Sequence, residues 1–327
     1  MPSISQNPAV NYVSRNNDLG GSLEEFDLIK ERENYIWADL APVVEVSKSS
    51  GQYGRLKLEE LLKERTTLRA PGAGYNRDSS RFEADNYSTV EHGAEEVVDD
   101  NLSEVYKDFF DAEMVARNRC FGAIARNAEK RWAAAIFDTA VYTGAALTTA
   151  IGTAWTEAAS TPIDNVEAAV QKVWENTGLW PNTIILNRHE FRNLRNNAQI
   201  LDRISSNGAG SSIKAGDVTR QQIAECFDLE KVLVGGGAEN TANENQTRSI
   251  SKIWDDSKAM VCVTAMTDDI AEPCIARTFH WSDDGSEIFG AVETYRDESV
   301  RGDVVRVRHQ VGEKIIYTQC GHLLTGI

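Results

Sequence analysis

Gly235-Gly236-Gly237 is the stretch whose composition most resembles a phosphate-binding loop. It lacks both the GxGxxG and the GxxxxGK[ST] spacing, and the polar stretch 240–246 behind it gives no helix signal. We therefore interpret the three glycines as a turn. Arg301-Gly302-Asp303 matches an integrin-recognition tripeptide, but in a chain without secretory features a turn between strands is the better interpretation.

Histidine, serine, cysteine and acidic residues form no recognised catalytic or metal-binding pattern. The histidines lack HExxH or another paired spacing, no serine lies in GxSxG, and no cysteine has a nucleophile signature. Ser282-Asp283-Asp284 resembles neither a calcium loop nor a catalytic pair, and we interpret it as a solvated turn. We therefore predict no catalytic, metal-binding or cofactor-binding residue, no cofactor and no enzymatic activity. The histidines are His92, His189, His280, His309 and His322.

Composition indicates a globular protein that does not hold nucleic acid tightly. The chain has 327 residues, 41% of them hydrophobic, with a formal charge of −16 and a pI of about 4.8. A net acidic surface repels phosphate, which excludes tight general binding of nucleic acid. The N-terminus shows no signal-peptide pattern and no apolar run reaches the length of a membrane span, so no membrane association is predicted. Five cysteines without CxxC pairs indicate reduced core thiols in a cytosolic protein: Cys120, Cys226, Cys262, Cys274 and Cys320.

One long amphipathic segment, from Asp99 to about Thr143, is the element along which the others must lie. Asp99, Asp100 and Asn101 can cap its start, and an apolar stripe follows at helical spacing. We predict one helix of about 60 Å at 1.5 Å per residue. Its arginines exclude a membrane span and its stripe is not a strict heptad, so we predict a spine with other elements beside it. The stripe consists of Leu102, Val105, Phe109, Ala112, Ala116, Cys120 and Ala123.

A polar arm and a long polar hairpin precede this helix. Residues 1–22 are polar, residues 23–39 have the pattern of a short helix, and Val43 opens a strand. Residues 48–93 have few large apolar side chains and a strong turn signal at Arg69-Ala70-Pro71-Gly72. Two extended arms would project roughly 60 Å, and such a hairpin cannot bury itself, so we expect a partner to cover it.

A second globular unit follows the spine. Thr161-Pro162 starts a predicted helix that ends at Gly178, and residues 183–186, 231–234 and 259–263 are predicted strands. Helices are predicted at 189–196 and 219–227, and the Gly/Ser stretch 205–212 is predicted to be a loop. From residue 278 the pattern alternates as in antiparallel strands, with turns at 282–285 and 311–313, and we expect these strands to pack beside the spine.

Several motifs, taken in chain order, resemble those of tailed-bacteriophage major capsid proteins, which have the Hong Kong 97-type capsid fold. The main one is the segment from Thr177-Gly178-Leu179-Trp180-Pro181-Asn182 through the strand 183–186 to His189-Glu190-Phe191. Others are Arg69-Ala70-Pro71-Gly72, Trp155 before Thr161-Pro162, the strand 231–234 before Asn240-Thr241, and Pro273 before Phe279-His280-Trp281. Each motif is weak alone, but their common order covers nearly the whole chain after residue 30.

The resemblance implies an α+β subunit with an N-terminal arm, an E-loop hairpin, a P-domain containing the spine helix, and an A-domain. The implied boundaries are 1–30 for the arm, 31–43 for the start of the P-domain, 44–94 for the E-loop, 95–159 for the spine and linker, 160–275 for the A-domain, and 276–327 for the P-domain strands. The short polar arm leads us to expect no large N-terminal scaffolding segment. By the same resemblance the E-loop lies across a neighbouring subunit, with contacts from Arg69, Pro71, Gly72, Tyr75, Arg77 and Arg81.

The function implied is that of a structural major capsid protein. Copies would assemble into the hexamers and pentamers of an icosahedral shell in the host bacterial cytoplasm, enclosing double-stranded DNA without sequence-specific binding and remaining in the virion capsid. Portal, scaffold and decoration proteins are further partners of such shells. An encapsulin-type protein compartment shares the fold and is the nearer alternative. An α+β enzyme using residues 205–212 as a lid is the alternative from another functional class.

Overall fold

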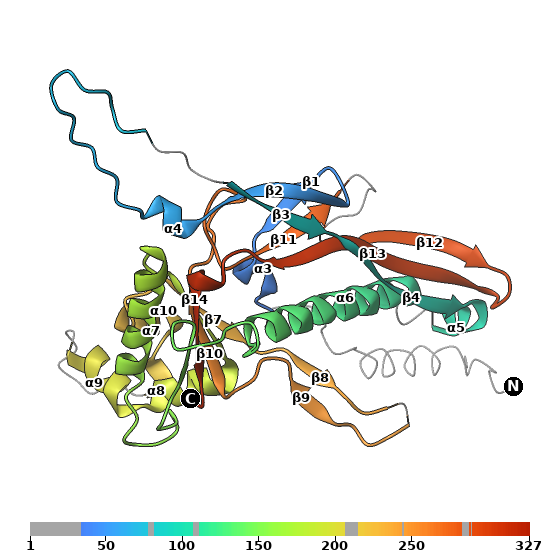
Figure 1. Ribbon diagram of the computed structural model, residues 1–327. Helices are drawn as coiled ribbons and strands as arrows, with labels where there is room; N and C mark the ends of the chain where they lie inside the picture. The colour runs from blue at the N-terminus through green and yellow to red at the C-terminus, as the bar shows by residue number, and fades with distance from the viewer. Residues whose placement is uncertain are drawn as a thin grey trace, which may run out of the picture.

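Two β-sheets and one long helix organise the chain, as the predicted α+β class requires. Helix α6 (Ala112–Ile136) runs along the first sheet, and the second sheet and its helices lie at the C-terminal end of α6 (Figure 1). This computed structural model describes residues 34–77, 82–106, 111–206, 215–243, 245–282, 288 and 290–327.

The first sheet is built around one 14-residue strand, β13 (Gly302–Ile315). It pairs antiparallel with β4 (Val90–Asp99) on one edge and with β12 (Ala291–Asp297) on the other. Its C-terminal part pairs with β11 (Ala276–Trp281), which in turn pairs in parallel with β1 (Val43–Val46). The sheet is therefore assembled from both ends of the chain.

Helix α6 packs on β4 and β13 through small and branched side chains. Cys120 and Ile124 are buried against Val307, while Ala116 is buried against Val98. Small residues in the helix allow a close approach to the sheet, and burial of this apolar surface stabilises the contact by roughly 25 cal/mol per Å². The prediction that the C-terminal strands pack beside the spine is confirmed.

The spine helix is shorter than predicted. The segment predicted as one helix from residue 99 to 143 contains α5 (Asp100–Tyr106) and the separate helix α6. Asp111 has an extended backbone, and its Oδ1 accepts hydrogen bonds from the N–H groups of Glu113 and Met114 at 3.0 and 3.3 Å, so it caps a new helix. The 25 residues of α6 span about 37 Å rather than about 60 Å.

The polar hairpin is paired only at its root. There β2 (Ser50–Leu56) pairs antiparallel with β3 (Phe82–Ser88), and the one-turn helix α4 (Leu58–Leu61) follows β2. Residues 62–77, which we call the projecting loop, extend beyond the root without strand pairing. Apart from Leu62, which lies beside Gly178, the loop stands clear of the rest of the molecule (Figure 1). The predicted turn is confirmed: Gly72 has φ +83°, and the N–H of Ala73 donates to the carbonyl of Ala70.

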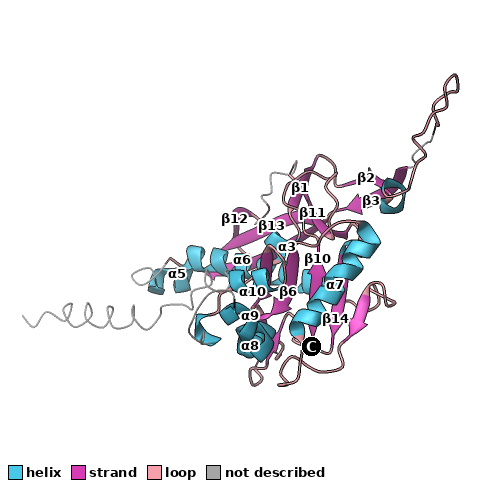
Figure 2. Ribbon diagram, turned by 90° about the vertical axis from the view of Figure 1, so that its left-hand side faces the viewer, coloured by secondary structure: helices cyan, strands magenta, loops and turns pink. Residues whose placement is uncertain are grey.

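The second sheet has five strands, in the order β5-β14-β10-β6-β7. Four helices surround it (Figures 1 and 2). The strands are β5 (Thr148–Ala150), β14 (Gly321–Thr325), β10 (Lys258–Cys262), β6 (Thr183–Asn187) and β7 (Lys231–Gly235). The helices are α7 (Pro162–Thr177), α8 (Arg188–Asn196), α9 (Ala198–Ser206) and α10 (Arg220–Cys226). Strand β14 thus belongs to this sheet, although it lies within residues 276–327, which the resemblance implied to be P-domain strands.

Most predicted elements of the second unit are confirmed. Pro162 is the first residue of α7, and Gly178 ends it with a left-handed φ of +70°. The strands predicted at 183–186, 231–234 and 259–263 correspond to β6, β7 and β10. The helices predicted at 189–196 and 219–227 correspond to α8 and α10.

One prediction of local structure was wrong, two elements were not predicted, and other predictions lie largely outside the described residues. The turn predicted at 311–313 is absent, because β13 continues through Gly312, where a Cβ would lie 2.3 Å from the carbonyl oxygen of Ser88. Helix α9 was not predicted, and neither was the hairpin of β8 (Ala238–Asn240) and β9 (Ile250–Lys252). The helix predicted at 23–39 lies mostly outside the described residues, which begin at residue 34. At its C-terminal end the structure has the short helix α3 (Trp37–Leu40). The predicted loop 205–212 and turn 282–285 lie largely outside them.

Candidate assembly interface

The projecting loop exposes two large apolar side chains. Leu68 is 86% exposed and Tyr75 is 74% exposed. The guanidinium of Arg69 lies over the Tyr75 ring at 4.7 Å, and its Nε donates to the carbonyl of Ala73 at 2.6 Å. Asn76 donates to the carbonyl of Thr66 at 2.9 Å and so links the two arms. The tip is therefore shaped by its own contacts before any partner binds.

Five of the six predicted contact residues lie together in this loop. Arg69, Pro71, Gly72, Tyr75 and Arg77 are all exposed there. Arg81 lies outside the described residues. The structure therefore brings the predicted residues to one projecting surface, and their contact with a neighbouring subunit is taken up below as a proposal.

Charged residues fix the root of the hairpin against the body of the molecule. Glu83 pairs with Lys57 at 2.7 Å and with Arg55 at 3.3 Å, and these cations hold the pKa of Glu83 below its usual range. Arg55 also donates to the carbonyl of Ile316 at 2.8 Å and lies over the ring of Tyr317. Arg55 therefore links the root of the hairpin to the connection between β13 and β14.

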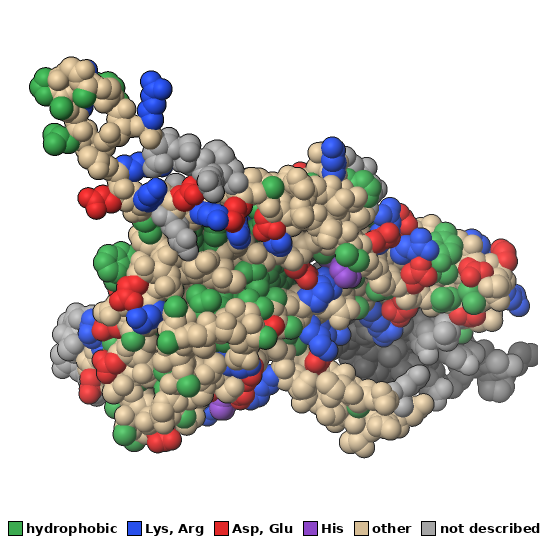
Figure 3. Space-filling view, in the orientation of Figure 1, with side chains coloured by type: hydrophobic (Ala, Val, Ile, Leu, Met, Phe, Trp, Pro, Cys, Tyr) green, Lys and Arg blue, Asp and Glu red, His purple; other side chains and the backbone are tan. Residues whose placement is uncertain are grey.

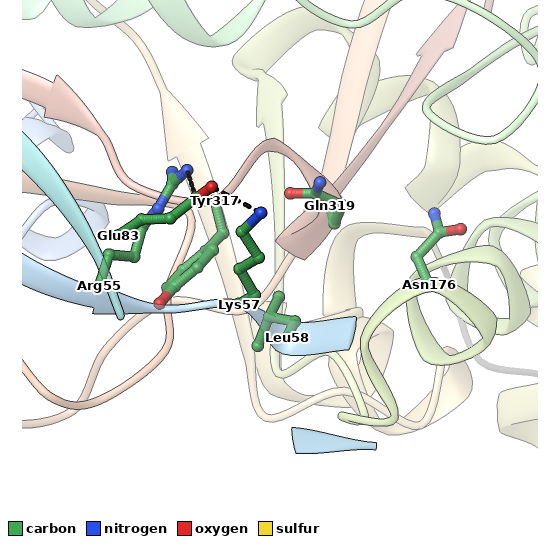
Figure 4. Close-up of a pocket in the computed structure, with 7 residues that line it drawn as sticks. All are labelled: Arg55, Lys57, Leu58, Glu83, Asn176, Tyr317 and Gln319. Atoms are coloured by element: carbon green, nitrogen blue, oxygen red, sulfur yellow. Dashed lines mark hydrogen bonds and ion pairs between the residues drawn. The ribbon is translucent and has the colours of Figure 1, made fainter. Parts of the chain in front are cut away.

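A cavity of about 180 Å³ lies beside these ion pairs (Figure 4). It separates the hairpin root from the C-terminal end of α7, and Gln319 and Asn176 lie on its far side (Figure 4). On the other side of the root, the ring of Tyr87 stacks on Phe279 with centroids 4.8 Å apart, and Lys314 pairs with Asp85 at 2.9 Å. The root of the loop is therefore held to the first sheet through β11 and β13.

A buried carboxylate joins three parts of the fold, and the sequence analysis missed it. Glu129 of α6 is fully buried and accepts hydrogen bonds from the N–H groups of Ile36 and Trp37 at 3.1 and 2.9 Å. It also accepts one from Nε1 of Trp254 at 2.5 Å. Burial raises its pKa to about 7, against the opposing effect of these hydrogen bonds. The one feature of the sequence that could have predicted a buried carboxylate is a single glutamate on a helical face otherwise made of Ala and Trp.

The three glycines at 235–237 pack against other parts of the chain. A Cβ on Gly235 would lie 2.3 Å from the Trp254 ring, and Gly236 and Gly237 face Asn34 and Tyr35 at close range. They therefore end β7 and connect it directly to β8, where neighbouring parts of the chain leave no room for side chains. Arg301-Gly302-Asp303 lies at the junction of a turn and β13, with Arg301 at φ +50°, also in agreement with the prediction.

Most of the other candidate side chains lie in the core, although His189 is exposed. All five cysteines are free and buried, as predicted for core thiols. His309 is buried and hydrogen-bonds through Nδ1 to the carbonyl of Ile288, and its pKa is lowered mainly by burial. Within the described residues, no group of three or more His, Cys, Asp or Glu side chains could hold a metal ion. Among the same residues, no helix combines the length and apolar character needed to span a bilayer.

Comparison with known proteins places this architecture among capsids. A phage-related protein from Bordetella bronchiseptica RB50 superposes with a TM-score of 0.66 at 21% identity, covering 91% of this chain and 96% of that one. The capsid of a native GTA particle gives 0.59 at 15% identity and 89% coverage of both chains. The capsid of cyanophage P-SCSP1u gives 0.58 at 13% identity, covering 89% and 88%.

This chain has the Hong Kong 97-type capsid fold. The resemblance seen in the sequence is thereby confirmed at the level of the fold. The SrpI encapsulin of Synechococcus elongatus PCC 7942 also superposes, with a TM-score of 0.52 at 9% identity, covering 89% of this chain and 86% of that one. No protein-family model and no curated protein sequence matches the chain. At 9–21% identity, these similarities are similarities of fold.

Proposed function

We propose that the chain is the major capsid protein of a tailed bacteriophage, with no enzymatic activity. Copies form hexamers and pentamers, and these build an icosahedral shell around double-stranded DNA in the host bacterial cytoplasm. The observation that carries the proposal is the projecting loop on a capsid fold, with Leu68 and Tyr75 largely exposed. A 16-residue extension without strand pairing gains stability only when another surface covers it.

In this proposal the projecting loop is the tip of the E-loop, and it lies on a neighbouring subunit. The contacting residues are Arg69, Pro71, Gly72, Tyr75, Arg77 and Arg81. The proposed E-loop is 44–94, the A-domain 160–275 and the P-domain 31–43, 95–159 and 276–327, with 1–30 as the arm. Residues 321–325 add a strand to the A-domain sheet.

The net charge of −16 supports a container that encloses nucleic acid without holding it. An encapsulin-type compartment is the second candidate, because the SrpI encapsulin has the same fold. The contents of assembled particles distinguish the two. Portal, scaffold and decoration proteins are proposed as further partners of the phage shell only.

The test is to express the chain and image the purified protein by electron microscopy. Closed shells of uniform size support the proposal, and a small monodisperse species under all salt conditions contradicts it. Particles isolated from cells producing the virus should contain double-stranded DNA protected from nuclease. Particles that enclose a protein cargo and no DNA would favour the compartment.

A further inference from the structure

The contact between α6 and the first sheet changes from apolar to titratable along its length. Val307 of β13 packs against Cys120 and Ile124 of α6. Side chains two residues apart on a strand share a face, so His309 points to the same side of β13. His92 of β4 lies directly opposite His309, with the two rings edge to face and their centroids 5.9 Å apart. In the space-filling view a histidine side chain reaches the surface between the first sheet and α6, beside Lys or Arg side chains (Figure 3).

His309 has no partner for a second proton. The residue is only 2% exposed, and its Nδ1 donates a hydrogen bond of 2.8 Å to the carbonyl of Ile288. Because a carbonyl accepts and cannot donate, Nδ1 carries the proton and Nε2 holds the lone pair. Within the described residues, Nε2 is buried without a hydrogen-bond partner. A proton added at Nε2 would therefore create a charge that is buried without an acceptor, which is costly.

Burial and the neighbouring side chains keep both histidines neutral at neutral pH. Burial lowers the pKa of His92 and of His309 below the usual value of 6.5, and the positive charge of Arg131 on α6 lowers both further. His92 and the buried His280 of β11 also lower the pKa of His309. Only the hydrogen bond to the carbonyl of Ile288 acts in the opposite direction on His309, and it does not prevail.

Two carboxylates on this side of the sheet are already paired with arginines of α6. Glu313 of β13 pairs with Arg131 at 2.8 Å, and Glu96 of β4 pairs with Arg119 at 2.9 Å. Ion pairs as well as apolar side chains therefore hold α6 on the sheet. A positive charge gained by the histidines would be repelled by Arg131, whose own carboxylate partner is already engaged.

We propose that His92 and His309 form an acid-sensitive contact, which lets α6 separate from the first sheet when both histidines are protonated. The open form accepts protons that the closed form excludes, so opening becomes more favourable as pH falls below about 6.5, where a free histidine gains its proton. Each histidine contributes up to about a tenfold rise in the opening constant per pH unit in that range. Because α6 leads into the second unit, opening would free the two units to move relative to each other.

The reactivity of Cys120 reports this opening. Its thiol is buried against Val305 of β13, whereas Cys226 is buried in the core of the second unit. The unassembled full-length chain is treated with a dipyridyl disulfide, which reacts with thiols at acidic pH, and labelled cysteines are identified by peptide mass spectrometry. Rates are divided by those of the denatured chain at the same pH. From about pH 7.5 to about pH 5 the relative rate at Cys120 should rise on the order of tenfold or more, while that at Cys226 stays constant.

Variants that cannot titrate separate the histidine pair from other effects of acid. His92→Asn with His309→Asn removes both titrating groups, and the asparagine amide can replace Nδ1 as the donor to the carbonyl of Ile288. This variant should keep Cys120 protected at acidic pH. The matched control His189→Asn replaces an exposed histidine of α8 and should respond as the wild type does. Circular dichroism establishes that each variant is folded. His92→Asn alone leaves the buried His309 in place and should lose part of the response, so it serves if the double variant does not fold.

Three outcomes overturn the inference. One is a relative rate at Cys120 that does not change with pH. Another is labelling of Cys226 together with Cys120, because the whole subunit would then be unfolding. The third is an acid response that persists undiminished in the variants lacking the histidines. All of these measurements use the unassembled chain, so the inference does not depend on the proposed function, and a failure to form shells would contradict only that function.

Discussion

Replacing Glu129 by methionine should make the stability of the subunit depend on pH in a different way from the wild type. Methionine has a similar length and removes the carboxylate that accepts hydrogen bonds from Ile36, Trp37 and Trp254. Each of these N–H groups then lacks its partner, at a cost of about 1–3 kcal/mol per group. The variant should therefore be less stable, although the same change also removes a buried titrating group.

The difference in free energy of unfolding between the wild type and the Glu129→Met variant changes with pH because of the pKa of Glu129. Burial raises the pKa of Glu129 from 4.5 to about 7 in the folded state. Its contribution to stability is fully present below about 4.5, the unfolded value, and is lost as pH rises through about 7. A difference of roughly 2.5 pKa units corresponds to about 3.4 kcal/mol. The variant should thus lose about 3 kcal/mol more, relative to wild type, near pH 4.5 than near pH 8.

Urea unfolding of the unassembled subunit at pH 4.5 to 8, followed by tryptophan fluorescence, measures both free energies of unfolding. Groups such as His92 and His309 titrate in both proteins, so their contributions cancel in the difference. Glu167→Met, at an exposed position of α7, is the control and should show no such trend. A constant difference across this pH range refutes the raised pKa. A difference largest at pH 8 would show that the three N–H donors hold the carboxylate ionised.

Three further changes have expected outcomes. Replacing residues 66–80 by a short Gly-Ser turn should leave a folded subunit, seen by circular dichroism, but no closed shells by electron microscopy; normal particles from this variant contradict the assignment of the loop. Gly312→Ala should lower the free energy of unfolding, measured by urea titration, by about 1–3 kcal/mol, because the new Cβ would lie 2.3 Å from the Ser88 carbonyl oxygen. The control Gly54→Ala has open space around the new Cβ and should lower it much less. In part of the family that the sequence resembles, a Lys–Asn isopeptide bond joins an E-loop lysine to an asparagine in the P-domain strands of a neighbour. No asparagine follows Asn245, so boiled particles should give one band near 36.2 kDa on a denaturing gel, and a ladder of covalent oligomers would contradict this.

The elements predicted correctly are those with strong local signals. Pro162 and Gly178 mark the two ends of α7, and Gly72 marks the turn of the projecting loop. Buried strands of the second sheet, such as β6, were predicted because short continuous apolar runs between turn signals are typical of them. In these segments local propensity and tertiary packing agree.

The incorrect predictions arose where tertiary contacts determine the structure. Asp111 has the residue type of a helix cap, but the apolar spacing continues through it and favoured one helix. Gly312 has the residue type of a turn, but in the fold it allows the Ser88 backbone to approach β13 closely. The sequence predicted the exposed loop of the candidate interface, since polar residues and a turn are visible directly. The buried Glu129 could not be predicted, because its three donors come from segments more than 90 residues away in each direction.

The pairing of β14 and β13 with segments far earlier in the chain bears on when the subunit can fold during its synthesis. Strand β14 lies between β5 and β10, so the second sheet is incomplete until residues 321–325 have left the ribosome. The first sheet likewise lacks its central strand until residues 302–315 are available. Such long-range pairing delays the completion of a fold. A chain synthesised only as far as residue 301 therefore lacks one strand of each sheet. Its hairpin root also lacks the contacts of Arg55 with Ile316 and of Asp85 with Lys314, so such a chain does not nucleate shells.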